Sequence, residues 1–257
     1  MAKKKVTIEA GNLRKVYVYT PPMPKDGARA RAERSKITTA AQKKLNYKTA
    51  QGKLELLIAC NFSANDLFVT LTYDDNHLPK TRKEALKNIK HFIRQLREIR
   101  QKQGKPLKYI YNTEDKHGAG RFHHHIIINS VDDKDMETLI SMWNYSEEQG
   151  VDIERLMKRK TDGRQFIDIA RYMTKEAAEE KPNDTRMYVC SRGLKRPKKY
   201  YEWIKDNETV IIPRNAELLE HEALVNQWGE FIYYKYIERE NPACNIWRAG
   251  VAERMNL

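Results

Sequence analysis

Three consecutive histidines stand at the start of an otherwise apolar stretch of the sequence. The stretch, residues 122–128 (FHHHIII), has a composition typical of a buried β-strand. Side chains alternate between the two faces of a strand, so His123 and His125 share one face and His124 lies on the other. Two imidazoles on one strand face can supply two ligands to a divalent cation. The sequence therefore predicts half of a metal site here, whereas His124 is expected to pack beneath the sheet.

A carboxylate that could complete the site ends the preceding apolar stretch. Residues 109–114 (YIYNTE) predict a strand that finishes at Glu114, and a Gly-containing segment joins it to the histidines. In a hairpin with Glu114 opposite His123, these two side chains and His125 converge on one face. A slip of one residue would send the carboxylate to the other face, so the metal hypothesis also predicts the register. Two imidazoles and a carboxylate suit Zn²⁺ or a harder Mg²⁺ or Mn²⁺ ion.

A tyrosine on a predicted helix could be the group that such a cation assists. Residues 167–180 predict a helix on which Asp168, Tyr172 and Lys175 share one face. A tyrosine phenolate can attack a phosphodiester phosphorus when a metal polarises the phosphoryl oxygens, and a lysine can hold the developing charge. We interpret Asp168 as an ordinary surface charge, and leave open a role as a further metal ligand or a partner of the tyrosine.

The charge of the chain indicates a polyanionic partner. The 257 residues carry a formal net charge of +13, and residues 1–60 alone hold 14 Lys and Arg against 4 Asp and Glu. Such a balance favours phosphate contacts to nucleic acid. The three scattered cysteines argue against a disulfide framework and a zinc ribbon. The N-terminal residues lack a signal peptide, and no run reaches membrane-spanning length, so a cytoplasmic protein is expected.

The pattern of apolar residues predicts an α+β fold with a central antiparallel sheet and flanking helices. Residues 1–38 are expected to be weakly structured, except for a short strand at 16–19. We expect an N-terminal extension over 1–65, the main domain over 66–205 and a C-terminal extension over 206–257. Helices are predicted near 39–61, 81–104, 135–145, 167–180 and 215–228, and strands near 68–73, 109–114, 122–128, 186–190, 209–212 and 231–237.

Three segments together resemble a known family of enzymes. Residues 68–73 (FVTLTY), 123–125 (HHH) and 172–175 (YMTK) have the order and spacing of the three motifs of HUH endonucleases. They look most like the single-tyrosine replication initiators of small rolling-circle phages and plasmids. The resemblance spans roughly residues 66–200, and 191–194 (SRGL) is similar to a downstream element of such proteins.

The resemblance implies a fold, a reaction and its residues. The family fold is a ferredoxin-like or RRM-like antiparallel sheet with flanking helices. Glu114, His123 and His125 would bind a divalent cation, Mg²⁺ or Mn²⁺. Tyr172 would nick single-stranded DNA at a replication origin, keeping a 5′-phosphotyrosine link and freeing a 3′-hydroxyl, with Lys175 assisting.

Two features of the sequence refine this expectation. Position 176 is glutamate, which disfavours the two-tyrosine subclass, and no P-loop is present, so a host helicase and polymerase in a bacterial cytoplasm are the expected partners. Five basic residues are predicted to contact DNA phosphates: Arg192, Lys195, Arg196, Lys198 and Lys199.

Two alternatives remain open from the sequence. The first is a single-tyrosine transposase or a relaxase-like recombinase, to which the basic N-terminal region is less suited. The second is a non-catalytic nucleic-acid-binding protein with a structural zinc ion. It is disfavoured because such sites are usually rich in cysteine, and no cysteine lies near the histidines.

Overall fold

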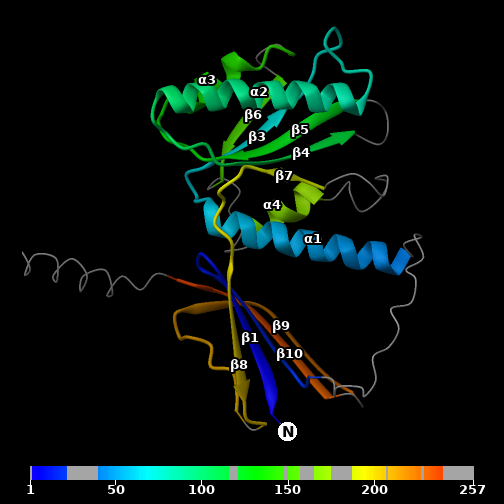
Figure 1. Ribbon diagram of the computed structural model, residues 1–257, viewed down its shortest axis with the longest axis vertical. Coiled ribbons are helices and arrows are strands. Elements are labelled where there is room, and N and C mark those ends of the chain that lie inside the picture. The colour runs from blue at the N-terminus through cyan, green and yellow to red at the C-terminus, as the bar shows by residue number, and fades with distance from the viewer. Residues whose placement is uncertain are drawn as a thin grey trace, which may run out of the picture. The chain divides into compact units, whose positions relative to one another are not determined.

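The computed structural model is α+β, as the sequence predicts. It describes residues 2–21, 40–115, 121–146, 150–156, 165–174, 187–206, 208–226 and 229–239. Within these residues the chain forms four α-helices and two antiparallel five-stranded sheets (Figure 1). The chain divides into two compact units, one made of residues 1–34 and 196–257 and the other of residues 35–195. The domain boundaries expected at 65 and 205 stay a prediction about function.

The unit of residues 35–195 is built on a sheet with strand order β6-β3-β5-β4-β7. The two central pairings, β3 with β5 and β5 with β4, are antiparallel, so the histidine strand lies in the middle of the sheet. The expected central antiparallel sheet is thereby confirmed. Its strands are β3 (Leu67–Leu71), β4 (Tyr109–Asp115), β5 (Phe122–Ile128), β6 (Val151–Arg155) and β7 (Val189–Cys190).

Helices cover both faces of this sheet, as Figure 1 shows. Alternate residues of β5 enter two separate cores: Ile126 and Ile128 pack in the cluster that includes α2 and α3, and Ile127 packs in the cluster that includes α1 and α4. The alternation predicted for this strand therefore separates two environments. The helices are α1 (Ala40–Asn61), α2 (Arg82–Lys102), α3 (Asp135–Met142) and α4 (Gln165–Thr174).

The longest amphipathic helix of this unit, α2, begins at the capping box that the sequence indicates. The Thr81 hydroxyl accepts a hydrogen bond from the Glu84 backbone N–H at 3.2 Å, which satisfies a donor that the first turn leaves open. Ile89, Phe92 and Leu96 recur at helical spacing and are buried against the sheet. This stripe fixes which side of α2 faces the core and which side faces solvent.

The other unit contains a second sheet with strand order β8-β1-β2-β10-β9. β1 pairs with β2, and also with β8, although β8 comes almost two hundred residues later in the chain. The core of this unit includes Val16, Val18, Ile204 and Tyr236. The strands are β1 (Lys3–Ala10), β2 (Leu13–Tyr19), β8 (Lys198–Ile204), β9 (Ala216–Asn226) and β10 (Gly229–Glu238).

Several expectations for this second sheet were wrong. Residues 3–19 form two paired strands rather than weakly structured chain, and 209–212 form no strand. The helix predicted over 215–228 is the strand β9, because its Ala, Leu and Glu residues favour a helix in isolation while the hairpin with β10 imposes an extended backbone. Residues 198–204, interpreted from their charge alone, form the strand β8.

None of the described helices combines the length and the hydrophobicity needed to cross a membrane.

Candidate metal centre

The hairpin of β4 and β5 has the register that the metal hypothesis requires. Glu114 lies directly opposite His123, and Asn112 lies opposite His125. On the other side of β5, Thr70 of β3 pairs with His125. The carboxylate and the two alternate imidazoles therefore lie on one face of the sheet, and the predicted register is confirmed.

The three side chains are close enough to share one cation. The Nε2 atoms of His123 and His125 lie 3.5 Å and 3.7 Å from the Glu114 Oε2 atom, and one ligand atom from each residue lies within 4.8 Å of the others. Two ligands at about 2.1 Å from a common ion are at most about 4.2 Å apart, so both separations fit. His125 and Glu114 are buried, at 1% and 8% exposure. Nitrogen and oxygen donors of this kind suit Zn²⁺, Mn²⁺ or Mg²⁺, and three ligands leave positions for a substrate oxygen.

Thr70 and Phe68 of β3 hold the His125 ring in place. The Thr70 Oγ1 atom lies 3.2 Å from the His125 Nδ1 atom. When Nδ1–H donates to this hydroxyl, Nε2 keeps its lone pair on the side of Glu114, which is the tautomer that a metal ligand needs. The Phe68 ring stacks on the His125 ring with centroids 5.6 Å apart and planes inclined by 21°. Both contacts come from the first of the three predicted motifs.

Asn112 links the carboxylate to helix α4, a role that the sequence analysis missed. Its side chain is 2% exposed, and its Nδ2 atom donates to Glu114 Oε1 at 2.5 Å and to the Met173 carbonyl at 2.7 Å. The signal available in the sequence was an amide in an apolar strand, two residues before Glu114 and therefore on the same face. Its partner on α4 could not be identified from that position.

Helix α4 brings Tyr172 beside the histidine pair. Ile169, Ala170 and Met173 are buried in the core against the sheet, which anchors the helix. The Tyr172 ring centroid lies 4.8 Å from that of His125, while 43% of the tyrosine remains exposed. The aromatic ring is therefore at the metal centre and still open to solvent. Asp168, one turn earlier, is partly exposed, and Lys175 lies outside the described residues.

His124 lies on the opposite face, as the sequence predicts. Its Nε2 atom is 2.8 Å from the Tyr73 hydroxyl, and its Nδ1 atom is 2.9 Å from the Thr113 hydroxyl. Complete burial, assisted by the neighbouring imidazoles, lowers the pKa of His124 from 6.5 to about 3. The ring is therefore neutral and serves the core rather than the metal centre.

We expect this buried imidazole to weaken the fold in acid. Below pH 6.5 the unfolded chain binds a proton at His124 that the folded chain takes up only near pH 3. Its contribution to stability is therefore complete above pH 6.5 and is lost as the pH falls toward 3, at up to about 1.4 kcal/mol per pH unit. Urea unfolding of the wild type and His124→Gln between pH 7 and 4 should show the steeper loss in the wild type. His91→Gln, a change on the exposed side of α2, should follow the wild type; equal slopes for all three proteins would contradict this.

The predicted DNA-contacting residues are all exposed, and their role stays a prediction. Between β7 and β8, Ser191 and Leu194 attach the chain to the sheet of the 35–195 unit: the Ser191 hydroxyl accepts from the Tyr109 N–H at 3.1 Å, and Leu194 is buried. The segment 191–194 thus has a structural role. The exposed basic residues are Arg192, Lys195, Arg196, Lys198 and Lys199.

Comparison with known proteins identifies the segment that contains this centre. Residues 66–179 match the model of a family described as Replication-associated protein ORF2. The three candidate ligands, Asn112 and Tyr172 all lie inside the matched segment. A search of curated proteins found no match, and neither did a search of solved structures.

Proposed function

We propose that this chain, whose residues 66–179 place it with the replication-associated protein family, initiates rolling-circle replication as an HUH-type nickase and strand transferase. The observation that carries the proposal is the approach of an exposed tyrosine on α4 to the Glu114, His123 and His125 group. A replication-associated protein must generate a primer end, and a nucleophile beside a cation site is suited to that task. Residues 66–205 would form the endonuclease domain.

The chain's own residues would divide the reaction among them. A bound divalent cation, Mg²⁺ or Mn²⁺, would supply Lewis-acid polarisation of the scissile phosphate. Glu114, His123 and His125 would hold that ion. The Tyr172 hydroxyl loses its proton to solvent and its oxygen bonds to phosphorus, while the bond from phosphorus to the 3′-oxygen breaks and that oxygen takes up a proton. The link is a phosphodiester, so a later 3′-hydroxyl can displace the tyrosine and reseal the strand.

The surroundings of Tyr172 suit a single strand. Its exposed fraction lets an extended phosphodiester reach the phenol, whereas a base pair would hold the backbone away from a ring that rests on Phe68 and His125. Lys175 would assist at the scissile group. The five basic residues between 192 and 199 would contact the backbone, and unwinding and synthesis would fall to a helicase and polymerase of a bacterial host.

The alternatives are less well supported. The family match concerns replication rather than transposition or conjugation. The candidate ligand group contains two histidines and a glutamate, and among the residues that the structure describes it includes no cysteine, which disfavours a structural zinc site.

A covalent-capture experiment tests the proposal. The full chain is incubated with a randomised pool of single-stranded oligonucleotides, and the species that remain attached in SDS are sequenced. With Mn²⁺ or Mg²⁺ we expect an adduct on the 5′ end of the downstream fragment and a free 3′-hydroxyl on the other; EDTA should abolish it, and added metal should restore it. Absence of any adduct with either ion, or cleavage at full rate in EDTA, would refute the proposal.

A further inference from the structure

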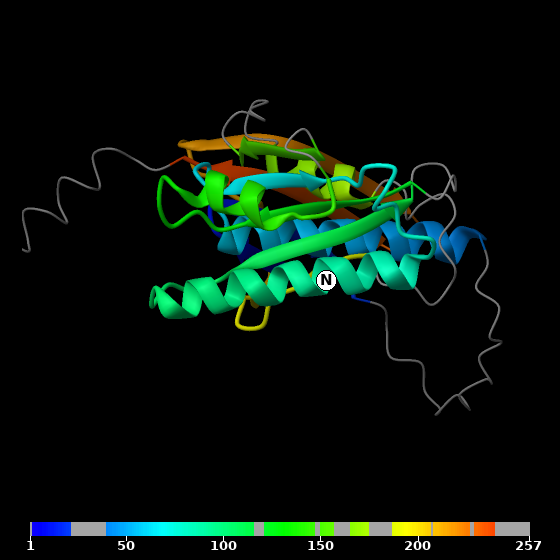
Figure 2. The same ribbon diagram turned by 90° about the horizontal axis from the view of Figure 1, so that it is seen from above.

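Helix α2 carries a straight line of cations along its solvent side. The line, here the basic stripe, consists of residues spaced alternately four and three apart, which places them on one side of a helix. Figures 1 and 2 show α2 as one unbroken helix, and the stripe runs about 21 Å along it at about 1.5 Å per residue. All five members are exposed: Lys83, Lys87, Lys90, Arg94 and Arg97.

The charges of the basic stripe are not neutralised by neighbouring carboxylates. None of the ion pairs found among the described residues includes a member of the stripe. Arg94 contacts the His91 ring at 2.9 Å, and Arg97 donates to the Tyr109 hydroxyl at 3.2 Å, neither of which removes a positive charge. Five cations therefore face solvent together.

This arrangement is unfavourable for the helix itself. Successive members of the stripe are like charges three or four residues apart, which repel one another across a helical turn. Lys83 and Lys87 also lie near the N-terminal end, where the helix dipole disfavours positive charge. A helix selected for stability alone would intersperse acidic residues here. A polyanionic partner would offset the repulsion.

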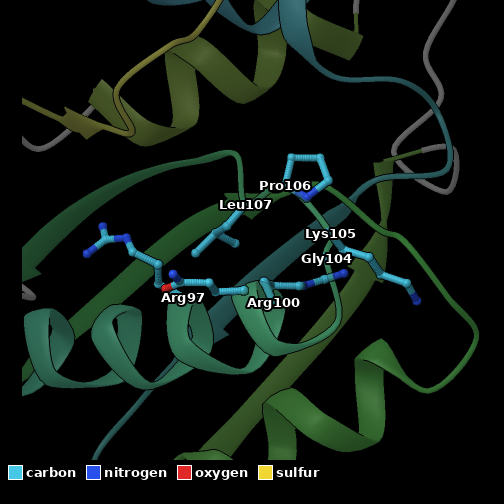
Figure 3. Close-up of a pocket in the computed structure, with 7 residues that line it drawn as sticks. Arg97, Arg100, Gly104, Lys105, Pro106 and Leu107 are labelled. Atoms are coloured by element: carbon cyan, nitrogen blue, oxygen red, sulfur yellow. The ribbon is translucent and has the colours of Figure 1, made fainter.

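The stripe continues past the end of α2 into a shallow hollow of about 550 Å³. Figure 3 shows Arg97 and Lys105 at opposite sides of this hollow, with the loop of Gly104 and Pro106 between them. Arg100, which also lines it, is 2% exposed and pairs with Asp135 at 2.7 Å, so it supports the floor. Lys105 pairs with Asp132 at 2.8 Å. The hollow extends the basic surface by one partly compensated cation.

We propose that the basic stripe binds the phosphate backbone of duplex DNA. The exposed residues of α2 include no phenylalanine, tyrosine or tryptophan, whereas surfaces for single strands combine cations with such rings, on which bases stack. The apolar side of α2 packs on the face of the sheet opposite to Glu114 and His125. DNA on the stripe is therefore a different segment from the strand at Tyr172. This inference goes beyond the proposed nicking reaction and does not depend on it.

Duplex binding by matched variants of the full chain tests this inference. Anisotropy with a labelled 30-base-pair duplex is measured across about 50–300 mM salt. Replacing all five stripe residues by glutamine should weaken binding at least about tenfold near 0.1 M salt and flatten the slope of log K against log salt by about 3 to 4. The control removes five exposed lysines elsewhere and should change affinity less than about threefold: Lys48→Gln, Lys53→Gln, Lys102→Gln, Lys134→Gln and Lys205→Gln.

Other outcomes would overturn the inference. Equal losses in the two variants would mean that net charge alone binds DNA, and an unchanged affinity of the stripe variant would exclude the surface. An equal loss for a single-stranded oligonucleotide would exclude selectivity for the duplex. The stripe variant should melt no lower than the wild type, because repulsion is removed, and should still form the SDS-stable adduct with short single strands. If the wild type binds duplex through the stripe but forms no adduct, the inference stands and the proposed function fails.

Discussion

Replacing Tyr172 by phenylalanine is expected to abolish the covalent protein–DNA adduct while leaving the metal centre intact. The change removes only the hydroxyl, so the ring contacts with His125 and Phe68 remain and α4 keeps its anchor. Without the attacking oxygen, adduct formation should fall at least about a thousandfold. The measurement is the rate of SDS-stable adduct formation on a captured oligonucleotide with Mn²⁺, together with the Kd for the same oligonucleotide, which should change less than about twofold.

Two other tyrosines provide controls for this experiment. Tyr188 is partly buried against the core of the α1 side, and Tyr200 lies exposed on β8 in the other unit. Tyr188→Phe and Tyr200→Phe should form the adduct at the wild-type rate. An adduct that persists in Tyr172→Phe and disappears in either control would transfer the nucleophile to that residue and contradict the assignment.

The second large effect is expected for Glu114→Gln. Glutamine matches the size of glutamate, but it removes the negative charge from the group formed with His123 and His125. We expect the affinity for Mn²⁺, measured by calorimetry, to fall at least about tenfold. Adduct formation at a fixed Mn²⁺ concentration should fall at least about a hundredfold and recover in part at higher Mn²⁺.

Asp168→Asn is the matched control, because it removes a carboxylate from the exposed part of α4. We expect it to leave the affinity for Mn²⁺ unchanged, in agreement with its interpretation as a surface charge. A loss as large as that of Glu114→Gln would make Asp168 a further ligand. Wild-type affinity and adduct formation in Glu114→Gln would instead show that the carboxylate is not part of the centre.

The hairpin of β4 and β5 was predictable because its information is local. A period of two separates His123 and His125 from His124, and only one register puts Glu114 on the face of the histidine pair. The same reasoning could not identify Asn112, since a polar residue in a strand does not disclose a partner sixty-one residues away on another helix. The local pattern thus gave the ligands but not their support.

The sheet of the other unit was largely unpredictable for a related reason. The strands β1 and β8 stabilise each other across almost the whole chain, so neither segment carries the signal alone. In β9, Leu218, Leu224 and Val225 are exposed, and the strand therefore lacks the alternation that would have distinguished it from a helix. Pairing partners decided the backbone there, and composition indicated the opposite.

The two hydrogen bonds of Asn112 give the protein's two halves of chemistry a common mounting. One amide nitrogen holds Glu114 on β4 and the Met173 carbonyl in the last turn of α4, next to Tyr172. A displacement of that helix is therefore passed on to the carboxylate, and the two move together. The spacing between phenol and cation can then vary less than either position does, which is what an in-line attack within a few tenths of an ångström demands.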